Sequence, residues 1–230
     1  MKNKIIKIIP LLGIFSVILY FLHVILGEIF YEGYNPFAQA VSDLTASNSP
    51  SKNIARVFST LYGICAVSFS IGFFAYLRNK INKVITVSSL VFCIMNTVSF
   101  FGYTFFPLTE SGYAGTFQDK AHMIVTGFVV LLTIVSLILF SVGFFGAKGH
   151  KWLGVISISA LLLLMAGAML INIAPKEYFG VAERINIYTI ILYTGILSLW
   201  LKKYITFCPV PEPQPPICTW HKWFYILFLG

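Results

Sequence analysis

The chain has 230 residues, of which 58% are hydrophobic and only 10% are charged, and its net charge is +8. A soluble domain carries about a quarter charged residues, so this composition excludes an ordinary soluble domain. We predict one membrane domain over residues 1–203, followed by a proline-rich, aromatic cytoplasmic tail over residues 204–230.

Long uncharged stretches follow one another along the chain. They cover residues 8–27, 57–77, 84–106, 123–147, 152–175 and 185–201. Each meets or approaches the about 20 apolar residues that a transmembrane helix needs. Only helices and closed barrels satisfy the main chain within lipid. The sequence therefore predicts an all-α fold, a six-helix transmembrane bundle.

The charges in the connecting segments sort by sign. Basic residues precede the first stretch, follow the sixth, and fill the turns RNKINK and KGHK. Seven of the eight acidic residues lie in or beside the other loops, and only Glu212 is in the tail. The positive-inside rule then places both termini in the cytoplasm of a multi-pass protein, and we expect a bacterial cytoplasmic membrane. The basic excess reflects this topology and attraction to anionic lipid, so we expect no nucleic-acid partner.

Two capping signals lie in the outer loops. Asn35 followed by Pro36 is typical of a helix start, and it predicts a short helix from Pro36 to about Leu44 in the first outer loop. Thr116 with Asp119 three residues later predicts that the fourth spanning helix begins near Phe117.

Polar residues collect in the outer loops and at the outer ends of the spans. An ionisable residue at the membrane boundary is a functional-site candidate by default. We take His122, Asp43 and Ser42 as candidate catalytic residues. The candidate ligand-binding residues are Arg56, Glu183, Arg184 and Asn35.

Each candidate also has a structural interpretation. Asp43 is either a catalytic or metal-coordinating carboxylate, or it pairs with an arginine, Arg56 or Arg184, and fixes the loop. His122 is a general base or proton carrier, or it hydrogen-bonds a loop near a helix N-terminus. Ser42 is a nucleophile beside an acid, or a turn residue.

The basic side chain of Arg184 has the same ambiguity. A guanidinium at the membrane boundary can bind a phosphate or carboxylate of a lipid through two hydrogen bonds. Alternatively, Glu183 neutralises it through a neighbouring helix. The motifs GxSxG, HExxH, the Walker loop and a G-x-G-x-x-G with a charged partner are all missing from the sequence. We expect neither a metal nor a cofactor.

Four short motifs give the chain a resemblance to a known family. They are YNPFAQAVSDLTA after the first span, FPLTE after the third, DKAHMIVTG with its histidine, and GVAERINIY before the last. In their order and spacing they resemble the DUF998 family of uncharacterised bacterial membrane proteins, over roughly residues 8–202. This resemblance implies a six-helix domain with an outward-facing polar cluster and no firmly established activity.

Three functions stay open at this point. The first is a membrane protein whose outward-facing polar pocket binds a membrane lipid headgroup or a small amphiphilic ligand. The second is a membrane-embedded hydrolase or transferase that uses His122 with Asp43 or Glu183. The third is a small transporter, which is weakest because nothing charged lies near the middle of any span. The oligomeric state is left open.

Overall fold

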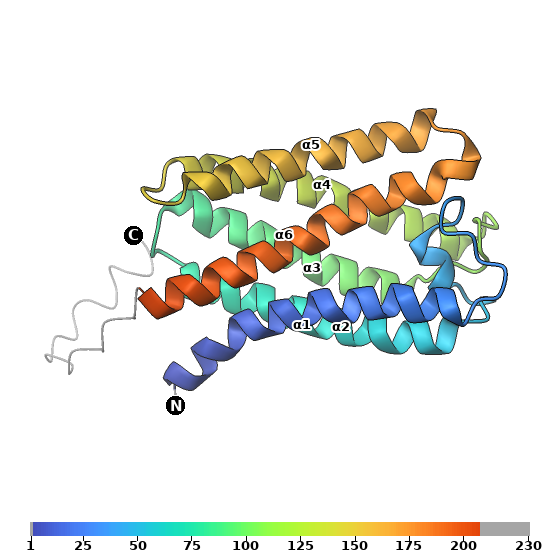
Figure 1. Ribbon diagram of the computed structural model, residues 1–230, viewed down its shortest axis with the longest axis horizontal. Helices are drawn as coiled ribbons and strands as arrows, with labels where there is room; N and C mark the ends of the chain where they lie inside the picture. The colour runs from blue at the N-terminus through green and yellow to red at the C-terminus, as the bar shows by residue number, and fades with distance from the viewer. Residues whose placement is uncertain (1, 208–230) are drawn as a thin grey trace, which may run out of the picture.

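The computed structural model describes residues 2–207, which form a bundle of six long helices without a β-strand (Figure 1). The helices are α1 (Lys2–Ile29), α2 (Lys52–Leu77), α3 (Lys83–Phe105), α4 (Phe117–Phe145), α5 (Lys151–Ile173) and α6 (Phe179–Phe207). Two 3₁₀ helices, η1 (Val41–Thr45) and η2 (Lys176–Tyr178), lie in the loops. All six long helices have the length and hydropathy to cross a membrane. The predicted six-helix transmembrane fold is therefore confirmed.

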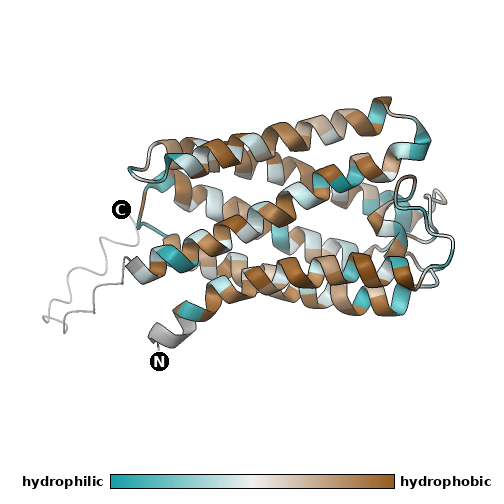
Figure 2. Cartoon of the chain, in the orientation of Figure 1, coloured by the Kyte–Doolittle hydropathy of each residue, from teal (hydrophilic) through white to brown (hydrophobic). Residues whose placement is uncertain are grey.

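The helices form a closed ring. Each helix packs against its neighbours in the chain, and α1 packs against α6. The start of α1 and the described end of α6 lie at one end of the bundle, and the long loops with η1 lie at the other (Figure 1). We call these the turn end and the cap end. Polar colouring concentrates at both ends, and the helices between them are mostly apolar (Figure 2). Which end faces the cytoplasm stays a prediction from the charge pattern.

The connections at the turn end are short, as predicted from RNKINK and KGHK. Asn82, in the connection between α2 and α3, links the start of α3 to the end of α4. Its side chain accepts a hydrogen bond from the amide of Ile85 at 2.8 Å, which caps α3, and donates to the carbonyl of Gly143 in α4 at 2.8 Å. α6 continues to Phe207, past the predicted boundary at residue 203, and the rest of the predicted tail lies outside the described residues.

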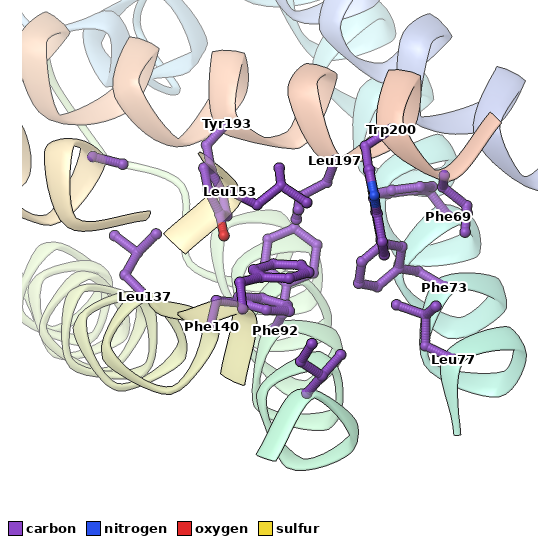
Figure 3. Packing of buried hydrophobic residues seen from close by; sticks show 14 of the residues in the cluster. Phe69, Phe73, Leu77, Phe92, Leu137, Phe140, Leu153, Tyr193, Leu197 and Trp200 are labelled. Atoms are coloured by element: carbon purple, nitrogen blue, oxygen red, sulfur yellow. The ribbon is translucent and has the colours of Figure 1, made fainter. Parts of the chain in front are cut away.

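Aromatic side chains fill the centre of the ring towards the turn end (Figure 3). The ring of Phe140 lies 6.1 Å from each of the rings of Phe73, Phe92 and Tyr193. Trp200 closes the group, at 6.2 Å from Phe73. Lipid tails are as apolar as these side chains, so the helices are held by close packing more than by exclusion of water. We call this group the aromatic plug.

The predicted short helix in the first outer loop exists, but its bounds are different. The helical segment is η1, which begins at Val41, whereas residues 36–39 form a turn. The carbonyls of Pro36 and Gln39 accept hydrogen bonds from the guanidinium of Arg184, at 2.7 and 2.8 Å. The carbonyls of Pro36 and Gln39 therefore point towards α6, and the helical segment begins only after them, at Val41.

Candidate functional site

The guanidinium of Arg184 is the centre of the cap end. Its Nη1 donates to the carbonyls of Pro36 and Gln39, and its Nη2 donates to the Glu28 carboxylate and the Tyr34 hydroxyl, both at 2.8 Å. Glu28 also forms an ion pair with it, and only 11% of the arginine side chain is exposed. Arg184 thus ties α1, the first outer loop and α6 together. Its predicted neutralisation by Glu183 is replaced by the pair with Glu28.

Tyr34 extends this network into the loop. Its hydroxyl donates to the carbonyl of Ala40 at 2.7 Å while it accepts from Arg184. Burial raises the pKa of Tyr34 above its ordinary value, so the phenol keeps the proton that it donates. The phenol of Tyr34 and the guanidinium of Arg184 therefore both donate hydrogen bonds to main-chain carbonyls of the turn before η1.

Two carboxylates bind the first amides of η1. Glu183 accepts from the amide of Val41 at 2.6 Å, and Asp43 accepts from the amide of Ala40 at 3.0 Å. The amides at the start of a helix lack partners within the helix, which makes them natural partners for anions. The second oxygen of Asp43 accepts from the amide of Gly112 at 3.1 Å. Asp43 thus joins the two long loops through main-chain amides, and in the described residues no arginine pairs with it.

A second buried carboxylate organises the loop between α3 and α4. Asp119 accepts from the amide and the hydroxyl of Thr109, at 2.7 and 2.6 Å, and from the amide of Thr116 at 3.2 Å. The Thr116 hydroxyl accepts from the amide of Asp119 in return, so the predicted capping box and the predicted start of α4 at Phe117 are confirmed. Asp119 is fully buried. The side chain of Asp119 therefore both stabilises the loop between α3 and α4 and caps the start of α4.

His122 lies one turn further along α4 and contacts the same loop. Its Nδ1 lies 2.8 Å from the carbonyl of Phe106, and its ring lies 4.8 Å from that of Tyr103. A carbonyl can only accept, so Nδ1 carries the proton and Nε2 is the free acceptor in the neutral ring. Among the described residues, no hydrogen bond links His122 to Asp43 or Glu183. Its role as a catalytic base stays a prediction.

The other predicted residues also lie at the cap end and also contact the main chain. Arg56 donates to the carbonyl of Thr45 at 3.0 Å and to the Ser47 hydroxyl at 3.3 Å. The carbonyl of Ser42 accepts from the Thr45 hydroxyl, and the Asn35 side chain accepts from the amide of Phe37 at 3.0 Å. The structure thus brings all seven candidates to one end, where their polar contacts stabilise the loops. Their catalytic or ligand-binding roles stay predictions.

Sequence reasoning missed Gly180, at the start of α6. A side chain at this position would collide with the main-chain oxygens of Gln39, Pro36 and Phe37. The next amide, that of Val181, donates to the carbonyl of Phe37 at 3.2 Å. The position of this glycine three residues before the Glu183–Arg184 pair is the only signal in the sequence, and it does not reveal which loop comes close.

A groove runs between α5 and α6, on the outside of the ring. It encloses about 730 Å³ and is lined mainly by apolar side chains, with Arg184 and Tyr188 towards the cap end. The turn residues Pro36 and Phe37 form part of its wall there. Along the rest of the groove the lining includes Ile156, Leu163, Ile185, Leu192 and Ile196. The groove thus joins the loop network to the membrane-spanning part of the bundle.

Comparison with known proteins gives one match. The family described as "Protein of unknown function (DUF998)" matches residues 14–200, which include all four motifs of the cap end. No curated protein and no solved structure matches the chain. Because the family match covers most of the chain, this six-helix protein belongs to the DUF998 family, as its motifs implied.

Proposed function

We propose that the protein binds a membrane lipid by taking its hydrocarbon chain into the groove between α5 and α6. The groove volume of about 730 Å³ is the observation that carries this proposal, because ligand sites usually enclose about 300–1,000 Å³ and are mostly apolar. The lining residues belong mainly to two membrane-spanning helices, so the molecules that meet the groove are lipids.

The polar end of the groove favours a lipid whose head carries little net charge. Arg184 lies there, but it is already paired with Glu28 and bound to two carbonyls. A phosphate would have to displace these partners. We therefore assign Arg184 the role of positioning Pro36 and Phe37 in the groove wall. The hydrocarbon chain then supplies most of the binding energy through contacts with the apolar lining.

The test compares two neighbouring leucines of α5. Leu163 lines the groove, whereas Leu162 is 63% exposed and is not among the groove residues. Leu163→Trp fills the groove, and Leu162→Trp adds the same bulk to the lipid-facing surface. Both variants would be reconstituted in dioleoyl phosphatidylcholine, extracted in detergent, and the retained lipid per protein measured by mass spectrometry.

We expect Leu163→Trp to lose most of the retained lipid and Leu162→Trp to keep the wild-type amount. Equal retention in the wild type and in Leu163→Trp would contradict the proposal. The thermal unfolding midpoint of each variant separates a filled groove from a damaged fold.

A further inference from the structure

The groove between α5 and α6 has a single charged residue in its lining, Arg184. Its other lining residues are apolar or carry only a hydroxyl group. The head of a lipid whose chain lies in the groove therefore meets one full charge there, that of the guanidinium. The partners of this guanidinium then decide which heads the groove can accept.

The nitrogen Nη2 of Arg184 is the one that a phosphate would need. A phosphate binds a guanidinium best through two parallel N–H groups, and the two pairs that allow this are Nη1 with Nη2 and Nε with Nη2. Both pairs include Nη2. In the structure Nη2 donates to the Glu28 carboxylate and to the Tyr34 hydroxyl, both at 2.8 Å. Glu28 thus occupies the nitrogen that both ways of binding a phosphate share.

Glu28 also cancels the charge of Arg184. The distance between its Oε1 and Nη2 is 2.8 Å, and this is the only ion pair in the described part of the chain. Glu28 belongs to the last turn of α1 and is not among the residues that line the groove. It therefore acts on the groove through Arg184, which reaches from α6 to α1.

An ion pair at this position discriminates lipids by the charge of the head. A head with a net negative charge would enter beside two charges that already cancel, and a charge without a counter-charge is costly in a medium of low dielectric. A neutral or zwitterionic head brings no net charge and avoids this cost. The hydrocarbon chain gains the same contacts with the apolar lining in both cases, so the head alone makes the difference.

We propose that Glu28 sets the head-group preference of the groove. By holding Arg184 it favours lipids with a neutral or zwitterionic head and disfavours lipids with an anionic head. Removal of its charge leaves the guanidinium without a counter-charge at the groove, and anionic lipids are then accepted as well. This inference rests on the proposed function, because it concerns the head of the lipid whose chain fills the groove.

The test measures which lipid the groove takes from a mixed membrane. The full chain is reconstituted in equal amounts of dioleoyl phosphatidylcholine and dioleoyl phosphatidylglycerol, which differ only in the head, and is then extracted in detergent. Mass spectrometry counts each retained lipid per protein. Groove lipid is defined as the amount lost when Leu163→Trp is added to the wild type or to a variant. This difference leaves out any phosphatidylglycerol held by the basic residues of the turn end.

We expect the groove lipid of the wild type to favour phosphatidylcholine about fivefold, a ratio on the scale of a partly exposed ion pair. Glu28→Gln should remove this preference, because glutamine keeps an acceptor for Nη2 but loses the charge. Glu28→Asp keeps the charge and should retain the preference. Glu32→Gln is the matched control, since Glu32 is an exposed acid shortly after α1, and it should behave like the wild type.

Two results would overturn this inference and leave the groove in place. The first is wild-type groove lipid that holds both lipids in the proportion of the membrane, a result that does not depend on the folding of any Glu28 variant. The second is a Glu28→Gln variant with the wild-type thermal unfolding midpoint whose groove lipid matches that of Glu32→Gln. If Leu163→Trp removes no lipid from the wild type, the proposed function itself is contradicted, and this inference fails with it.

Discussion

Glu183 and Arg184 are adjacent in sequence and hold the same loop by opposite chemistry. Glu183 accepts from the amide of Val41 at 2.6 Å, and Arg184 donates to the carbonyl of Pro36 at 2.7 Å. The loop segment from Pro36 to Val41 is therefore bonded to a donor, Arg184, at its first residue and to an acceptor, Glu183, at its last. A shift of the loop along α6 would break both contacts, so the pair fixes the position of the loop as well as its attachment.

The first prediction concerns removal of the guanidinium. Arg184→Ala leaves the carbonyls of Pro36 and Gln39 and the carboxylate of Glu28 without their donor. We expect the free energy of unfolding to fall by about 3 kcal/mol, since breaking a largely buried pair strands its partner. Arg184→Lys should lose less, because one ammonium reaches only some of these acceptors. Thermal and chemical unfolding in detergent measure the loss, with the exposed Arg78→Ala as the control. Equal stability of Arg184→Ala and Arg78→Ala would contradict this role.

The second prediction concerns the close approach of the loop to α6. Gly180→Ala places a methyl group against main-chain oxygens of the first outer loop, and a main chain yields less readily than a side chain. We expect faster amide hydrogen exchange over residues 34–45 with unchanged helical content. Gly127→Ala is the matched control, because a methyl group there meets nothing within 4 Å. Unchanged exchange in Gly180→Ala would show that the loop is not held by this contact.

The number and order of the spans were predictable because the thickness of the bilayer sets the length of each apolar stretch. The residues at which the helices begin and end were less predictable. α2 begins at Lys52 and α6 at Phe179, five and six residues before the apolar stretches at 57 and 185. A helix continues into the interface wherever its polar side chains find partners there, and hydropathy does not record such partners.

The cap end shows a second limit of sequence reasoning. The opposite charges of Asp43 and Arg56 suggest an ion pair, yet Asp43 binds the amides of Ala40 and Gly112. The amide of Ala40 at the start of η1 and the amide of Gly112 both need an acceptor, whereas an ion pair with a partly exposed arginine would contribute little. The inward-facing side chains of α1 escaped prediction for another reason. Almost every face of α1 is apolar, so its sequence does not show which side chains point into the ring.

The third prediction concerns the loop between α3 and α4. Asp119→Asn keeps one carbonyl oxygen for Thr109 but turns an NH₂ group towards the amide of Thr116, donor against donor. We expect a loss of about 2 kcal/mol in the free energy of unfolding, the usual cost of a buried polar group left unsatisfied. Glu110→Gln is the control, because Glu110 is an exposed acid in the same loop and should change stability by less than about 0.5 kcal/mol. Similar losses in the two variants would contradict this role.

The fourth prediction decides between a structural and a chemical role for His122. If its Nδ1 proton mainly satisfies the carbonyl of Phe106, His122→Ala should lower the free energy of unfolding by about 2 kcal/mol. His122→Asn should recover much of this loss, because its amide N–H lies near the position of Nδ1. Thermal unfolding in detergent gives both values.

The opposite result would also be informative about the chemistry. If His122→Ala and His122→Asn both kept the wild-type stability, the imidazole would not be needed to hold the loop. The hydrolase or transferase hypothesis would then gain support, because His122 would be free of a structural role and its Nε2 is a free acceptor. If instead the alanine variant is destabilised and the asparagine variant is not, then the hydrogen bond to Phe106 accounts for the histidine, and the search for function belongs at the groove between α5 and α6.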